Sequence, residues 1–363
     1  MSRSAGRFLV TSILISSALG AALAGEGDEP KVADGKSVLA ITVRSARSGA
    51  WSDAGTWAPG RAPASHDRVR IEPGHEVVYD ARSDNVIDFL HVAGTLRFAR
   101  DRDTRLTVGL LRVDPIVDEK PEGSGVEDVH DHHEGHPSGP EAVLEVGTPI
   151  APIPHPYKAE IRLAYVDGHS QDSSPAIICR PGGRMELHGA PMSRTWIDLG
   201  ADAKKGDERV ALDEDVTGWR AGDTVIITGS EHRSSNAIGG FRGNVHRLET
   251  EERRISSIEG RTIVLDRPLE HDHAGTGPHR SEIANLSRTV VIESADPAGV
   301  RGHTMFHVHS AGAISYARFA HLGKEGVLGR YPIHFHRVRS TMRGSSVVGA
   351  AIVDSHNRWL TIH

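Results

Sequence analysis

The sequence of 363 residues has a single cysteine, Cys179, so no disulfide bond can form within the chain. It also lacks a long basic run: 42 Lys and Arg stand against 48 Asp and Glu, giving a formal net charge of −6. No positively charged stripe is present that could follow a phosphate backbone, and we expect no nucleic-acid partner. Stability has to come from packing and hydrogen-bonded ladders instead.

Beyond its first residues the chain also lacks any apolar run long enough to span a membrane. Residues 1–24 begin with two arginines, continue with an apolar stretch and end in small residues around Leu23, a pattern typical of a secretory signal peptide. A single membrane anchor is the alternative, but the stretch is short and diluted by serines. We expect cleavage and export, giving a secreted or cell-surface protein with no stable membrane span.

Short runs of Val, Ile and Thr, separated by Gly, Pro, Asp and Asn, favour many short strands over helices and predict an all-β protein. After a linker over residues 25–40, we expect a first β-rich module at 41–190 and a second strand-rich region at 191–363. Within the second region, Glu259 and Gly260 read as the turn of a hairpin.

The first module is interrupted at residues 115–140 by an acidic, glycine-rich and histidine-rich insertion without apolar periodicity. Such a tract can capture a transition metal, which would make the chain a metal-scavenging protein. A solvated loop with adventitious metal affinity is the simpler interpretation, because an irregular tract has no surrounding groups to orient its ligands. The histidines concerned are His130, His132, His133 and His136.

Five other histidines recur at a regular interval along the second region. The pair His307 and His309 is followed by His334 and His336, and then by His363, so that the period is 27 (334 − 307 and 363 − 336). A repeat of this order built from short strands indicates a solenoid, in which equivalent positions stack about 4.8 Å apart. The spacing predicts a parallel β-helix.

Strand alternation predicts that these histidines point outward, because the residues between them are apolar. We expect one outward column of His309, His336 and His363, with His307 and His334 beside it. Imidazoles on neighbouring strands can share a divalent ion, zinc or calcium, or hydrogen-bond a polar ligand. The alternative is a row of surface histidines without a function.

Other side chains near this row are weaker candidates. Arg330 could receive a carboxylate, and Glu325 or Asp354 could act as general acid or base. No pair of carboxylates is placed by the sequence, so the catalytic residues stay unknown. His303, His321 and His356 lie off the predicted columns.

Several stretches carry a family resemblance. Residues 49–80, GAWSDAGTWAPGRAPASHDRVRIEPGHEVVYD, resemble the G8 domain, a β-rich module of secreted and cell-surface proteins. Downstream stretches, among them GHTMFHVH and LGRYPIHFH, are similar to the continuation seen in the cell-migration-inducing and transmembrane cell-surface hyaluronidases and in fibrocystin-like proteins. The resemblance implies a G8 domain at 41–190 followed by a right-handed parallel β-helix that is truncated at its C-terminal end.

The same resemblance implies an acidic polysaccharide such as hyaluronan as ligand. Residue by residue, it favours Arg330, His334 and His336 as substrate-binding residues, with His303 next. The resulting hypothesis is an exported protein that binds an acidic polysaccharide on the histidine-bearing face, with cleavage by hydrolysis or elimination left open. The rival hypothesis is a non-catalytic adhesion or matrix protein.

Overall fold

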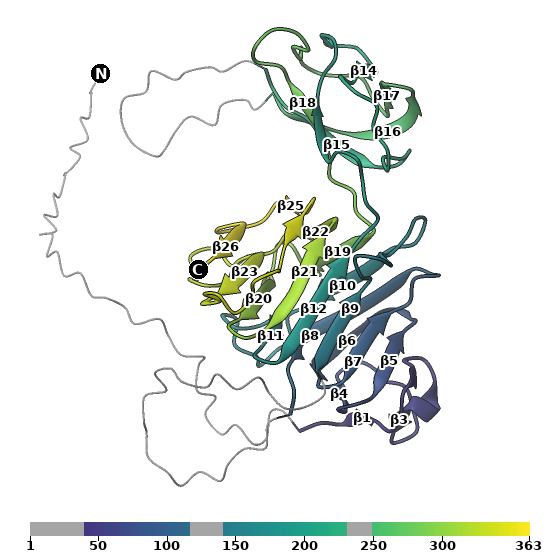
Figure 1. The fold of residues 1–363 in the computed structure, drawn as a ribbon, viewed down its shortest axis with the longest axis vertical. Helices are drawn as coiled ribbons and strands as arrows, with labels where there is room; N and C mark the ends of the chain where they lie inside the picture. The colour runs from purple at the N-terminus through teal and green to yellow at the C-terminus, as the bar shows by residue number, and fades with distance from the viewer. Residues whose placement is uncertain (1–39, 117–140, 231–248) are drawn as a thin grey trace, which may run out of the picture.

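The computed structural model describes residues 40–116, 141–230 and 249–363. Strands follow each other around a three-sided parallel β-helix, and a smaller antiparallel module projects from it (Figure 1). Each coil visits face 1, then face 2, then face 3 before the chain returns to face 1. The all-β fold and the parallel β-helix predicted from the sequence are confirmed.

The three faces are ladders of parallel strands, each strand adding one coil. Two long strands, β6 (Arg82–Val92) and β8 (Thr104–Val113), turn a corner, so their first halves belong to face 3 and their second halves to face 1. The other strands of face 1 are β1 (Val43–Ser45), β4 (Arg68–Ile71), β11 (Ala176–Cys179), β20 (His303–His307), β23 (Ile333–His336) and β26 (Leu360–Ile362).

Face 2 comprises β2 (Gly49–Ala50), β5 (Glu76–Tyr79), β7 (Thr95–Phe98), β9 (Ala142–Val146), β12 (Gly183–His188), β21 (Ala311–Ser315) and β24 (Val347–Val348). Face 3 is completed by β10 (Ala159–Leu163), β19 (Val290–Ser294), β22 (Ala317–Ala320) and β25 (Ala351–Val353). At the start of the solenoid, the 3-10 turn η1 (Ala54–Thr56) leads into β3 (Trp57–Ala58), which pairs antiparallel with β1.

The interior of the solenoid is filled by stacked apolar side chains, because alternate residues of every strand point inward. In one column the rings of Phe306 and Phe335 lie parallel with their centroids 4.7 Å apart. Cys179 occupies the same column, and burial raises the pKa of its thiol far above the usual range. The full column contains Ile71, Val92, Val113, Cys179, Phe306 and Phe335, all buried.

Residues 191–230 and 249–288 form the projecting module, which leaves the solenoid after β12 and returns at β19 (Figure 1). Its two ends meet, since the amide of Ala190 donates to Oγ1 of Thr289 at 2.8 Å. The predicted hairpin turn at Glu259 and Gly260 is confirmed between its fourth and fifth strands. The strands are β13 (Trp196–Asp198), β14 (Arg209–Ala211), β15 (Thr224–Ile227), β16 (Glu251–Glu259), β17 (Thr262–Leu265) and β18 (Glu282–Asn285).

The projecting module has a hydrophobic core of its own, built around Trp219, Val225 and Ile283, and separate from the solenoid interior. Residues 41–116 and 141–190, by contrast, form the first coils of the same solenoid that residues 289–363 continue, because β11 and β12 pair directly with β20 and β21. No helix in the described ranges is long and apolar enough to cross a membrane.

Candidate functional site

Four histidines gather on the outward side of face 1, where β20, β23 and β26 lie side by side (Figure 1). His334 and His336 belong to β23, and the residue between them, Phe335, points into the interior and is buried. Alternation along the strand therefore turns both imidazoles outward. His307 ends β20, and His363 directly follows β26.

The strand register differs from the predicted stacking in one coil. His307 pairs with His336, so the spacing in this coil is 29 (336 − 307). The prediction that His309 stacks on His336 is therefore wrong, because this coil is longer than expected. His309 lies beyond β20 in an exposed turn with a φ of 58°. The spacing of 27 holds in the next coil, where His334 pairs with Thr361.

Three of the four imidazoles are close enough to share one ion. One nitrogen from each of His334, His336 and His363 lies within 4.8 Å of the other two. Nε2 of His363 is 2.9 Å from Nε2 of His334 and 3.3 Å from Nδ1 of His336. Tetrahedral zinc, with Zn–N bonds of about 2.0–2.1 Å, places its ligand nitrogens about 3.3 Å apart. The two separations from Nε2 of His363 are close to that value, and the third, between His334 and His336, is within 4.8 Å.

The tautomer of His334 is fixed by the loop that precedes its strand. Nδ1 of His334 is 2.8 Å from the carbonyl oxygen of Gly329, and because a carbonyl only accepts, Nδ1 carries the proton and donates. Nε2, the nitrogen that faces His363, is then left with a lone pair. A metal-binding histidine is commonly oriented by such a bond from its other ring nitrogen.

Two imidazoles of this cluster, those of His334 and His336, are held in the uncharged form. Burial, with a smaller contribution from neighbouring histidines, lowers the pKa of His334 to about 4. Burial, followed by His363 and Arg330, also lowers the pKa of His336. Near neutral pH both rings are therefore neutral, which is the form that binds a metal ion.

A cationic corner adjoins the histidines. Nε of Arg330 donates to the carbonyl oxygen of Asp172 at 2.9 Å. Burial, followed by the charge of Arg330, lowers the pKa of Lys324 to about 8. The ammonium group of Lys324 donates to the carbonyl oxygens of Ser174, at 2.9 Å, and Arg301. The sequence did not indicate that Lys324 is buried, because a lysine in a glycine-rich loop normally reads as solvated.

The remaining candidates lie outside the cluster of three imidazoles. His303 is buried on β20, and its Nδ1 has no hydrogen-bond partner within the described residues. Glu325 is largely exposed, with a carboxylate oxygen 4.0 Å from Nδ1 of His356. Asp354 is exposed after β25, and His321 lies at the end of β22. Where the structure describes the chain, no carboxylate joins the three imidazoles.

The second predicted metal-binding tract, His130 to His136, lies outside the described residues. So do the predicted signal peptide and nearly all of the linker that follows it. On face 1, three histidines form a set that could hold one divalent ion, with an exposed ligand in His363 and a guanidinium nearby.

Two segments of the chain match known protein families. Residues 56–200 match the family described as G8 domain, and residues 299–363 match the family described as CEMIP beta-helix. Fibrocystin-L of Homo sapiens is 30% identical over 280 residues, which is 61% of this chain and 6% of that protein. Communication mutant protein F of Dictyostelium discoideum is 29% identical over 192 residues, which is 52% of this chain and 16% of that protein.

These two segments are similar to the G8 domain and to the CEMIP beta-helix, and the predicted family resemblance is confirmed. The chain spans only a small part of the length of these relatives. Among solved structures, the Gp54 tailspike of Acinetobacter baumannii bacteriophage AP22, in complex with A. baumannii capsular saccharide, matches 71% of this chain and 32% of its own. At a TM-score of 0.24 and 11% identity, this likeness carries no argument about function.

Proposed function

We propose that this protein binds an acidic polysaccharide, with hyaluronan as the first ligand to test, on the outward side of face 1. The observation that carries the proposal is the convergence of His334, His336 and His363, with one nitrogen of each within 4.8 Å of the others. In this proposal the three imidazoles hold one divalent ion, and Arg330 supplies a second cationic contact.

The donor set suits zinc better than calcium. Calcium takes six to eight oxygen ligands, whereas the cluster offers three imidazole nitrogens. Three protein ligands leave a fourth tetrahedral position for water or ligand. When bound, zinc would supply Lewis acidity there, attracting a carboxylate oxygen or lowering the pKa of a bound water.

The residues of the chain supply orientation and charge. The carbonyl group of Gly329 holds the His334 ring with Nε2 toward the cluster. Arg330, fixed through Asp172, presents a guanidinium, a group that pairs with carboxylates in a two-bond geometry. In hyaluronan, every second sugar is a uronic acid that offers such a carboxylate.

Binding without cleavage is the form of the proposal that the surroundings favour. Glycosidic hydrolysis commonly uses two carboxylates on either side of the bond, and neither Glu325 nor Asp354 joins the imidazoles. A non-catalytic adhesion or matrix protein is therefore the natural second candidate. For either role we propose export, with residues 1–24 as the signal peptide and the mature protein secreted or at the cell surface.

The test is calorimetric titration with hyaluronan, chondroitin and pectate oligosaccharides, with and without a chelator. The corresponding full-length polymers are incubated with the protein separately, and their chain lengths are then measured. We expect at least one acidic ligand to bind, the chelator to weaken that binding, and His336→Ala to abolish it. His309→Ala is the matched control, since it removes an imidazole from the neighbouring turn, and it should bind like the native chain. Binding that survives both the chelator and His336→Ala would refute the proposal, and shortened polymers would add cleavage to it.

A further inference from the structure

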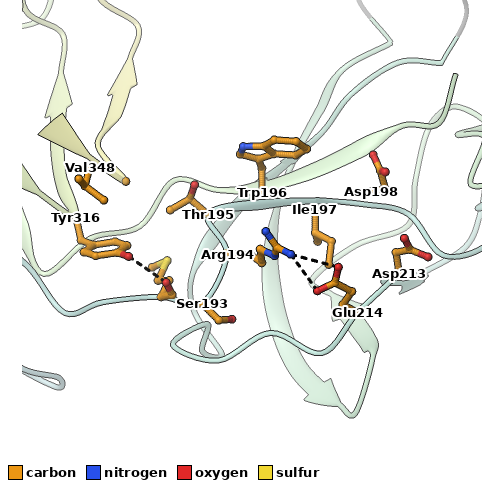
Figure 2. Close-up of a pocket in the computed structure, with 12 residues that line it drawn as sticks. Ser193, Arg194, Thr195, Trp196, Ile197, Asp198, Asp213, Glu214, Tyr316 and Val348 are labelled. Carbon is orange, nitrogen blue, oxygen red and sulfur yellow. Dashed lines mark hydrogen bonds and ion pairs between the residues drawn. The ribbon is translucent and has the colours of Figure 1, made fainter.

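A cavity of about 380 Å³ lies where the projecting module meets the solenoid, on the corner between faces 2 and 3. It is away from the histidines, which occupy face 1. Trp196 and its neighbours on β13 form one side, and Tyr316 and Val348 form the solenoid side (Figure 2). A cavity of this size falls in the range of small-ligand sites.

Trp196 is the most unusual member of the lining, because 55% of its surface is exposed. Its cross-strand partner on β18 is Ala284, which is too small to cover the indole. Figure 2 shows the ring standing clear of the neighbouring side chains. Within the described residues the indole N–H has no hydrogen-bond partner. A large aromatic face exposed beside a polar cavity is a platform on which the C–H face of a sugar ring can stack.

The polar part of the lining is acidic. Asp198, Asp213 and Glu214 contribute three carboxylates to the lining. Arg194 pairs with Glu214 at 3.3 Å, and Arg280 pairs with Asp198 at 2.5 Å and with Asp213 at 3.2 Å. Carboxylates accept hydrogen bonds from hydroxyl groups and repel other carboxylates. Because three carboxylates face two guanidiniums, an excess of one negative charge is left, and the lining suits a hydroxyl-rich, uncharged ligand better than a uronic acid.

The walls of the cavity are already tied in place. The indole nitrogen of Trp219 donates to the carbonyl oxygen of Arg194 at 2.7 Å. From the solenoid, the hydroxyl group of Tyr316 donates to the carbonyl oxygen of Met192 at 3.2 Å. These bonds tie the chain just before β13 to the rest of the projecting module and to the solenoid. Little conformational entropy is therefore lost from the cavity walls when a ligand binds.

We propose that this cavity is a second carbohydrate site, which takes a neutral sugar unit stacked on Trp196 with its hydroxyl groups donating to the carboxylates of Asp198, Asp213 or Glu214. It differs from the face 1 site in ligand class and uses none of its residues. A chain with both sites would hold an acidic polysaccharide at one place and a neutral glycan at another.

The test is calorimetric titration of the full chain with neutral oligosaccharides of glucose, galactose, mannose and N-acetylglucosamine, and with a hyaluronan tetrasaccharide as the acidic comparator. We expect one or more neutral ligands to bind, and Trp196→Ala to weaken that binding about tenfold or more. Trp359→Ala is the matched control, since Trp359 is 53% exposed on the solenoid, and it should leave the affinity unchanged.

Glu214→Gln should also weaken neutral binding, and His336→Ala should not affect it. Thermal unfolding of each variant shows whether the fold is retained, and Trp196→Ala should unfold at nearly the native temperature because the ring is exposed. The proposal is overturned if no neutral sugar binds at millimolar concentration, if Trp196→Ala binds as tightly as the native chain, or if His336→Ala removes neutral binding.

Discussion

At the scale of single residues, the candidate site depends on where individual nitrogens point. The hydrogen bond from His334 to Gly329 settles which ring nitrogen carries the proton, and the sequence shows no sign of that bond. The outward direction of His334 and His336, however, could be predicted from alternation with apolar neighbours, and the structure has both rings on the outward side. The burial of Lys324 could not be predicted, because it arises from loops that are distant from each other in the sequence.

Lys324 gives a prediction about pH. Its pKa is lowered from 10.5 to about 8, so between these values the unfolded chain holds a proton that the folded chain has lost. Stability then rises with pH across this window, by about 3 kcal/mol for this one group. Lys324→Met removes the titration. Urea unfolding at intervals from pH 7 to pH 10.5 should show the native chain gaining stability relative to the variant, and parallel curves would contradict the assignment.

Gly349 gives a second prediction at this scale. Its φ is +59°, and a Cβ built on it would lie 2.6 Å from the ring of Tyr316, on the corner beside the proposed neutral-sugar cavity. We expect Gly349→Ala to lower the unfolding free energy by about 1–3 kcal/mol through strain and overpacking. The matched control is Gly260→Ala, whose φ is +61° but whose Cβ would meet nothing within 4 Å. Equal losses of stability in the two variants would show that the ring contact is unimportant.

At the scale of strands, the register sets which histidines meet. The repeat was visible in the sequence, but its length is 29 in one coil (336 − 307) and 27 in the next (361 − 334). Loops at the corners of a solenoid can change length without disturbing the ladders, so sequence spacing alone could not separate His307 from His309. The structure separates them because hydrogen-bonded pairing, and not loop length, fixes the positions on face 1.

The interior column behind the histidines should be essential to that register. Phe306 stacks on Phe335, directly behind the strands that carry His307, His334 and His336. Phe306→Ala would leave a cavity, and we expect it to lower the unfolding free energy by about 3–5 kcal/mol. Leu328→Ala, at a side chain 69% exposed, is the control and should have little effect. A similar midpoint of denaturant unfolding for both variants would count against the stacked column.

At the scale of the whole molecule, the sequence predicted the class of fold but not how its parts are joined. The described residues of 41–190 build one solenoid with residues 289–363, although paired positions on β11 and β20, such as Ile177 and Thr304, are far apart in the sequence. The projecting module hid this continuity, because its strands alternate in the same way as those of the solenoid. The cavity beside Trp196 could not be predicted either, because Tyr316, on its other side, comes from a distant part of the sequence.

The two ends of the projecting module meet at Ala190 and Thr289, which suggests that it can be removed. We expect a chain with residues 191–288 replaced by a short Gly-Ser linker to keep the solenoid, because β10, β12, β19 and β21 still pair across the junction. Zinc binding should persist in this chain, and neutral-sugar binding should be lost. Circular dichroism checks whether the solenoid is retained, and calorimetry checks the binding of zinc and of neutral sugars. Loss of zinc binding in a folded variant would show that the module supports face 1.

The claim that His334, His336 and His363 form a metal site is tested most directly by the zinc content of the purified chain. The chain is first dialysed to equilibrium against a buffer that contains zinc. We predict one tightly held zinc per chain that disappears when His334, His336 and His363 are replaced together by alanine, and that remains when residues 130–136 are deleted. The opposite result, zinc that survives the triple replacement or leaves with the deleted tract, would show that the three imidazoles on face 1 do not form a metal site.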